Sequence, residues 1–150
     1  MVGNMSRNRT LWWVGAALLL LAVFVTYVRL TTTTTSRLGD LTIVTAAYAN
    51  PNLGATVSED VAKAAAIKKI HEIQPTVSGV QFNVARQASG LRGVQDSRGN
   101  PIYSNPTGVN AWVLEFSAPA QGGYKFVSGV VVVDSASGTV DSASILLSNT

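Results

Sequence analysis

The chain has 150 residues, enough for one domain of ordinary size, and it contains no cysteine. Disulfides, thiolate zinc sites and cysteine nucleophiles are therefore excluded. The net charge of +3 comes from the first 39 residues, because residues 40–150 hold seven Lys and Arg against eight Asp and Glu. A nucleic-acid-binding domain needs a basic surface to displace counterions, so this composition argues against nucleic acid as a partner.

The first predicted element is a transmembrane helix over residues 11–30, which follows a short N-terminal tail over residues 1–10. No charged residue lies between Leu11 and Val28, and twenty helical residues reach ~30 Å, the thickness of the hydrocarbon core. A cleaved signal peptide is the alternative, but its apolar region is usually shorter and ends in a small-residue cleavage site. The residues expected to anchor the helix at the two interfaces are Trp12, Trp13, Tyr27, Arg9 and Arg29.

This anchor predicts a single-pass protein of the cell membrane, in contact with lipid through residues 11–30. Arginines flank the segment on both sides, so the positive-inside rule gives little direction. A Ser-, Thr-, Ala- and Gly-rich domain with few lysines favours a C-terminal domain outside the cytoplasm. The threonine-rich stretch over residues 31–39 is predicted to be an extended tether between anchor and domain.

Residues 40–150 are predicted to form an α+β domain. The sequence Thr56-Val-Ser-Glu59 fits a capping box for a helix over 58–73, and Pro75 ends that helix. Apolar residues then alternate with a period of two, which predicts strands over 80–85, 112–117, 124–133 and 139–147. The expected fold class is α+β: an N-terminal transmembrane helix, then one helix packed on an antiparallel sheet of about four strands.

The last two predicted strands are joined by the sequence Asp134-Ser-Ala-Ser-Gly138. A calcium loop would need oxygen ligands at alternate positions, and Ala136 offers none, so we interpret the segment as a plain hairpin turn. With the preceding helix, the hairpin "VVVVDSASGTVDSASI" resembles the PepSY domain family over about residues 57–147. The resemblance implies an extracytoplasmic, non-catalytic domain of a kind associated with protease propeptides and regulatory binding, and it assigns no catalytic residue.

The segment over residues 90–110 is long for a plain loop. It is predicted to contact a protein partner, because arginines and exposed aromatic residues are enriched at interaction hot spots. The alternative is a solvated hairpin in which one aromatic side chain, Tyr103, folds back on the core. The candidate contact residues are Arg92, Arg98, Ile102 and Tyr103.

Few residues offer catalytic chemistry. His71 is the single histidine and falls on the polar side of the predicted helix, and Glu115 alternates with apolar residues of a strand and is expected to face water. We therefore predict no catalytic, cofactor-binding or metal-binding residue and no enzyme activity. The predicted function is a membrane-anchored, non-catalytic extracytoplasmic binding or regulatory domain. The alternative is an accessory single-pass subunit that stabilises a larger membrane complex, such as an electron-transfer or transport assembly.

Overall fold

The computed structural model describes residues 5–47, 49, 56–120 and 122–148, without the side chains of residues 5–12 and 29–30. The chain divides into two compact units at the boundary between Thr32 and Thr33. The first unit is a single helix, α1 (Met5–Thr31). Its described side chains are exposed, except for the partly exposed Val28.

Within the described residues, no helix has both the length and the apolarity that crossing a membrane requires. The finding contradicts the predicted transmembrane segment over 11–30. It likewise contradicts the single-pass membrane location and the placement of the C-terminal domain outside the cytoplasm, which depended on that segment.

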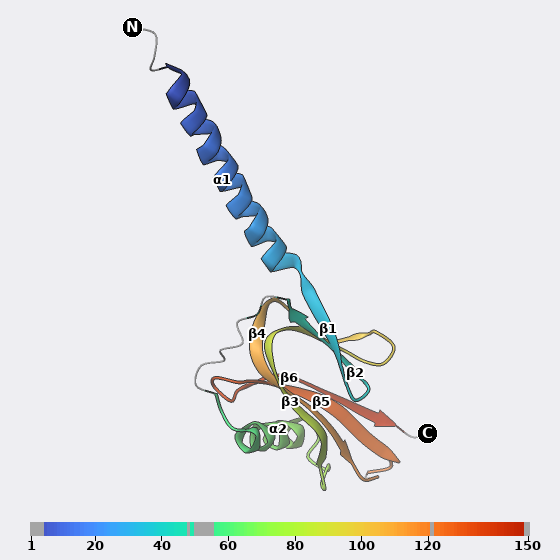
Figure 1. Cartoon of the computed structure of the whole chain (residues 1–150). Helices are drawn as coiled ribbons and strands as arrows, with labels where there is room; N and C mark the ends of the chain where they lie inside the picture. The colour runs from blue at the N-terminus through green and yellow to red at the C-terminus, as the bar shows by residue number, and fades with distance from the viewer. Residues whose placement is uncertain (1–4, 48, 50–55, 121, 149–150) are drawn as a thin grey trace. The chain divides into compact units, whose positions relative to one another are not determined.

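The second unit contains one six-stranded antiparallel sheet in which each strand pairs with the next along the chain (Figure 1). The predicted fold class, with about four strands and a transmembrane helix, is therefore wrong. The predicted tether over 31–39 contains the first strand, and the segment over 90–110 contains the ends of two long strands. The strands are β1 (Thr33–Leu38), β2 (Leu41–Ala46), β3 (Gln81–Gln95), β4 (Pro101–Ala118), β5 (Phe126–Asp134) and β6 (Val140–Ser148).

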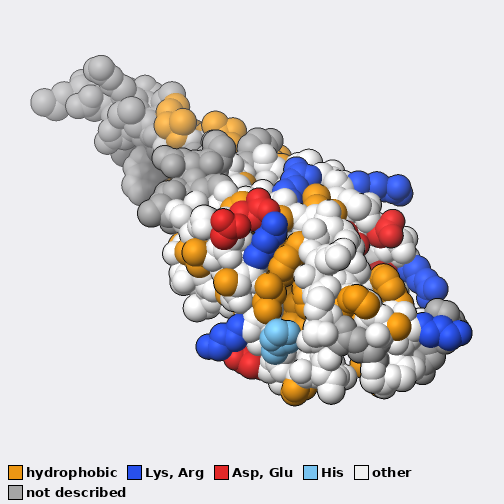
Figure 2. Space-filling model, turned by 90° about the horizontal axis from the view of Figure 1, so that it is seen from below, with side chains coloured by type: hydrophobic (Ala, Val, Ile, Leu, Met, Phe, Trp, Pro, Cys, Tyr) orange, Lys and Arg blue, Asp and Glu red, His pale blue; other side chains and the backbone are white. Residues whose placement is uncertain are grey.

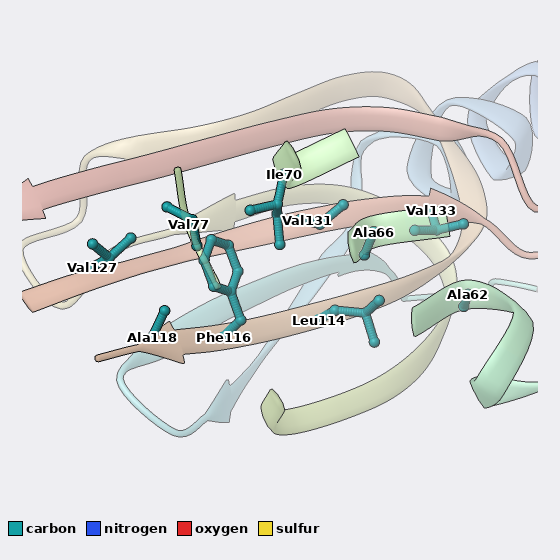
Figure 3. Close-up of a cluster of buried hydrophobic side chains, with 10 residues drawn as sticks. All are labelled: Ala62, Ala66, Ile70, Val77, Leu114, Phe116, Ala118, Val127, Val131 and Val133. Atoms are coloured by element: carbon teal, nitrogen blue, oxygen red, sulfur yellow. The ribbon is translucent and has the colours of Figure 1, made fainter. Parts of the chain in front are cut away.

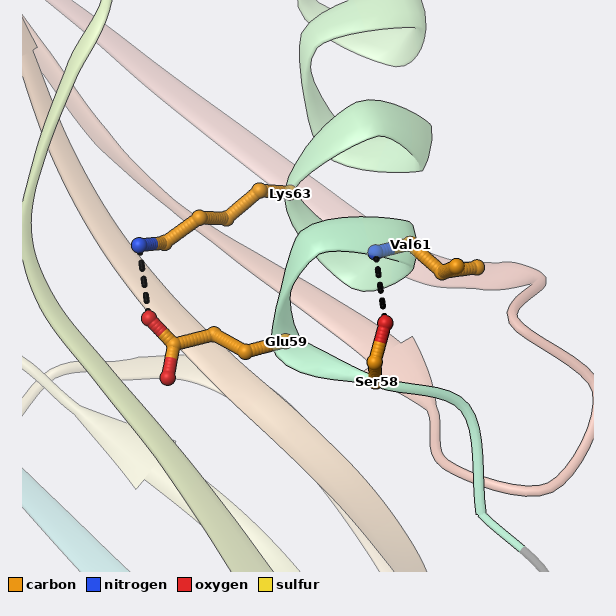
Figure 4. Close-up of polar contacts among 4 residues, drawn as sticks. All are labelled: Ser58, Glu59, Val61 and Lys63. Atoms are coloured by element: carbon orange, nitrogen blue, oxygen red, sulfur yellow. Dashed lines mark hydrogen bonds and ion pairs between the residues drawn. The ribbon is translucent and has the colours of Figure 1, made fainter.

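Helix α2 (Glu59–Ile73) begins one residue later than predicted, because Ser58 and not Thr56 caps it. The Ser58 hydroxyl accepts a hydrogen bond from the Val61 N–H (Figure 4). Glu59 reaches forward to Lys63 with a separation of 2.6 Å, instead of back to the cap as the capping box requires. Acidic residues in the first turn suit the positive end of the helix dipole.

The helix packs on one face of the sheet and forms the first hydrophobic core with it (Figure 3). Ala62, Ala66 and Ile70 recur at helical spacing and are fully buried. Their partners come from alternate positions of β4 and β5, whose side chains on this face are Leu114, Phe116, Ala118, Val127, Val131 and Val133.

The opposite face of the sheet is also buried, in a second hydrophobic core. Val113 of β4 and Val130 and Val132 of β5 pack there with Leu41 and Ile43 of β2. In a flat sheet β2 and β5 are three strands apart, about 14 Å. The sheet must therefore curl so that the β1–β2 hairpin lies over the face of β4 and β5. The Arg86 side chain of β3 also donates a hydrogen bond to the Ser36 hydroxyl of β1, at 3.4 Å, and so joins two strands that are not neighbours in the sheet.

Two glycines mark the bend in β3 and β4 that permits this curl. Gly90 and Gly108 both have positive φ, and a Cβ on Gly108 would lie 3.2 Å from the Gly90 carbonyl oxygen. The pairing register shifts around Leu91, as expected of a β-bulge. Asn110 stabilises the bulge because its side-chain oxygen accepts hydrogen bonds from the Gly90 N–H and the Ser89 hydroxyl.

Candidate binding groove

The curl of the sheet leaves a groove of about 270 Å³ at one end of the second core. Its walls are the β1–β2 turn and the β3–β4 turn, which overhang a floor made by β4, β5 and β6. In a flat sheet, β2 and β6 are about 19 Å apart, yet residues of both line this groove. The lining residues are Asp40, Leu41, Asp96, Ser97, Ile102, Glu115, Ser128, Gly129, Val130, Ser144 and Leu146.

The groove combines apolar surface with negatively charged side chains. Val130 is 5% exposed at the bottom, whereas Leu146 is 64% exposed and presents free apolar surface. The titratable side chains among the described lining residues are all carboxylates: Asp40, Asp96 and Glu115. A groove of this charge favours a ligand that carries positive charge.

Glu115 is the carboxylate closest to the core. It was expected to face water, but it pairs in register with Val130 and lies at the border of the second core. Burial raises the pKa of Glu115, and the nearby negative charge of Asp40 raises it further. Gly39 has a φ of +58°, and a Cβ at this position would lie 2.6 Å from the Glu115 carboxylate, so the β1–β2 turn presses directly on it.

We expect Glu115→Gln to stabilise the fold at neutral pH and not at acid pH. The raised pKa means that the folded state holds the Glu115 proton more tightly than the unfolded chain does. The wild-type protein therefore loses stability as the pH rises from the ordinary value near 4.5 through the raised pKa. The variant escapes this loss, and we expect a gain below about 1 kcal/mol, because a partly solvated charge is screened.

Urea unfolding of both proteins at pH 3.5 and pH 7 measures this difference. Asp96→Asn is the opposite control, because hydrogen bonds from Asn100 lower the pKa of Asp96. The Asp96→Asn variant is expected to be less stable than the wild-type protein at neutral pH, and this difference disappears as the pH falls through the lowered pKa. If Glu115→Gln raises the free energy of unfolding equally at both pH values, the Glu115 carboxylate does not lie partly buried at the border of the second core.

Asp96 has a structural role besides lining the groove. One of its carboxylate oxygens accepts hydrogen bonds from the N–H groups of Arg98 and Asn100, and the other accepts one from the Asn100 side chain, all at 2.8 Å. These bonds close the β3–β4 turn. Asp40 and Glu115 are therefore the carboxylates best placed to meet a ligand.

The predicted partner-contact residues separate in the structure. Ile102 lines the groove, and Tyr103 packs against the second core, as the alternative interpretation of this segment had it. Arg98 is exposed in the β3–β4 turn. Arg92 lies on β3, and its Nε atom is buried without a hydrogen-bond partner among the described residues. Of the four, only Ile102 belongs to the groove.

The single histidine, His71, is exposed on α2 and does not line the groove. It lines a shallow depression with Ala64, Ile67, Lys68 and Glu72. Positive and negative side chains alternate on this side of the molecule, with apolar patches between them (Figure 2). The described residues contain no group of three or more His, Asp or Glu that could hold a metal ion.

The segment Asp134–Gly138 forms the predicted turn between β5 and β6. One Asp134 carboxylate oxygen accepts hydrogen bonds from the Ala136 N–H, the Ser137 N–H and the Ser137 hydroxyl. The bonds from Ser137 lower the pKa of Asp134. The turn also positions the start of α2, because the Ser135 carbonyl accepts a hydrogen bond from the Val57 N–H at 2.8 Å. The Trp112 indole of β4 donates a second hydrogen bond, to the Val57 carbonyl, at 3.2 Å.

Sequence reasoning missed most of the groove. Asp40 is separated along the chain from Ser128, Ser144 and Leu146 by 88, 104 and 106 positions, and no local pattern relates them. The available signal was the glycine content of the segment over 90–110, which marks the bend in the two longest strands.

A scan against protein-family models gives no match. Comparisons with the curated proteins and with the solved structures give none either. The resemblance to the PepSY family therefore stays a prediction.

Proposed function

We propose that the sheet domain is a non-catalytic binding module whose groove takes a cationic segment of a protein partner. The proposal is based on one observation: the exposed apolar side chain of Leu146 and the carboxylates of Asp40 and Glu115 line the same groove. Apolar surface provides affinity, and complementary charge provides orientation and selectivity.

The chemistry of the groove favours binding over catalysis. Its described lining residues provide carboxyl and hydroxyl groups and aliphatic side chains, and they include no histidine or lysine that could activate a hydroxyl nucleophile. The exposed position of His71 on α2 leaves it outside this lining.

The test measures binding of a fluorescent nonapeptide in which lysine alternates with threonine. We expect the full chain to bind this peptide and the double variant Asp40→Asn/Glu115→Gln to bind it about tenfold more weakly, since two partly exposed ion pairs contribute about 1.4 kcal/mol together. Fluorescence anisotropy gives both dissociation constants.

The matched control is Asp60→Asn/Glu72→Gln, which makes the same change of charge on exposed positions of α2. We expect this variant to bind the peptide within about twofold of the wild-type protein, apart from weak long-range attraction. Equal weakening by both double variants shows attraction to the whole surface and contradicts the proposal, as does a wild-type chain that binds no lysine peptide.

A further inference from the structure

The outer edge of β6 borders the groove. In the part of the chain that the structure describes, β6 pairs with β5 on one side and takes no strand on the other. An edge strand presents a row of main-chain N–H and carbonyl groups to which another extended chain can pair.

This edge is regular and lacks the usual protection against pairing. From Ser142 to Ser148 the strand follows β5 residue by residue, and the single register shift lies before it, where Asp141 is the extra residue. The seven residues from Ser142 to Ser148 include no lysine, arginine or proline, the residues that commonly block edge pairing. The edge strand at the other side of the sheet, β1, is shorter and carries Arg37.

The two faces of β6 have different surroundings. Ala143, Ile145 and Leu147 pack against the core beneath α2. Ser144 and Leu146 point to the other face and line the groove. Ser144 pairs with Val130, and Val130 pairs with Glu115, so the three residues form one row across the sheet.

We propose that the partner is an extended peptide that adds to β6 as a seventh antiparallel or parallel strand, with a lysine or arginine in the row of Ser144. This inference rests on the proposed function of the groove. Main-chain pairing with β6 binds the peptide, and the long basic side chain extends over Ser144 toward Glu115 and Asp40.

Charge complementarity identifies the occupant. A second copy of this chain that paired through its own β6 would present Ser, Ala, Ile and Leu to the edge and no positive charge to the groove. A basic extended segment of another protein satisfies both the strand edge and the carboxylates.

The test compares the lysine–threonine nonapeptide with two analogues that carry N-methyl groups on its odd-numbered or its even-numbered residues. Only one set of N–H groups of a paired strand points toward β6, so we expect one analogue to bind at least tenfold more weakly and the other to bind nearly as the parent does. Hydrogen exchange of the outward-facing amides of residues 142–147 is expected to slow at least tenfold in the bound state.

A pair of variants adds an independent measurement on the full chain. Leu146→Lys places a positive charge on the groove floor and is expected to weaken binding of the parent peptide at least tenfold. Val61→Lys makes the same change at a comparably exposed position of α2, where Val61 is 50% exposed, and is expected to leave binding within twofold.

The outcomes separate the two proposals. If both N-methylated analogues bind as tightly as the parent, strand addition is wrong while a cation-binding groove stands. If no lysine peptide binds, both proposals fail. If sedimentation shows a dimer whose β6 amides are already protected without peptide, the edge belongs to a second copy and the inference is overturned.

Discussion

Gly129→Val is expected to destabilise the sheet domain by about 3 kcal/mol or more. Gly129 lies on β5 opposite Phe116 of β4. A Cβ at this position would fall 2.7 Å from a ring carbon of Phe116 and would also collide with the Ser144 carbonyl oxygen of β6. One neighbour is a fully buried ring and the other is backbone in a paired strand, so neither can move away cheaply.

Urea unfolding followed by circular dichroism measures this cost. Ser128→Val is the matched control, because it introduces the same side chain one residue away on the opposite face of β5, where Ser128 is partly exposed. We expect the control to stay within about 1 kcal/mol of the wild-type protein. If Gly129→Val and the wild-type protein are equally stable, the Phe116 ring does not lie against Gly129 of β5.

Phe116→Ala is expected to lower the free energy of unfolding by about 3–5 kcal/mol, the usual effect of removing a buried aromatic ring. Phe116 is 0% exposed and contributes its ring to the core between the sheet and α2 (Figure 3). Without it a cavity forms that the β-branched neighbours are too stiff to fill.

Phe126→Ala provides the comparison, since it removes the same atoms from a side chain that is 47% exposed. We expect this control to lose less than about 1.5 kcal/mol. Thermal or denaturant unfolding of the two variants side by side gives the difference, and equal losses contradict the assignment of the core to the α2 side of the sheet.

The sequence allowed α2 and the strands β4, β5 and β6 to be located because local physics determines them. The helical recurrence of Ala62, Ala66 and Ile70 and the alternation from Trp112 to Phe116 each reflect one buried face. The cap was misplaced by two residues, because Thr56 and Ser58 are both good capping side chains and only packing selects between them.

The strand β1 and the outer ends of β3 and β4 were not predicted, for a different reason. The threonines of β1 are mostly exposed, so burial leaves no alternation in that strand. The bent ends of β3 and β4 carry glycines and turn-forming residues that also favour loops. Their strand structure depends on pairing with β2 and with each other, which is a non-local condition.

The groove could not be predicted, because it exists only once the sheet curls on itself. Glu115 was expected to face water on the ground that its neighbours in sequence face the α2 core. The curl covers its side of the sheet with the β1–β2 hairpin, and Gly39 brings that hairpin against it. A period of two assigns residues to faces but does not reveal whether a second face is covered.

The most direct test of the account is the location at which the lysine peptide binds. Amide chemical shifts of the isotope-labelled full chain, followed during titration, report this location residue by residue. Binding in the groove predicts perturbed amides at Asp40, Glu115, Ser144 and Leu146, which surround it, and along the rest of β6. Perturbations confined to the outer face of α2 around His71, or none in the groove at saturating peptide, contradict it.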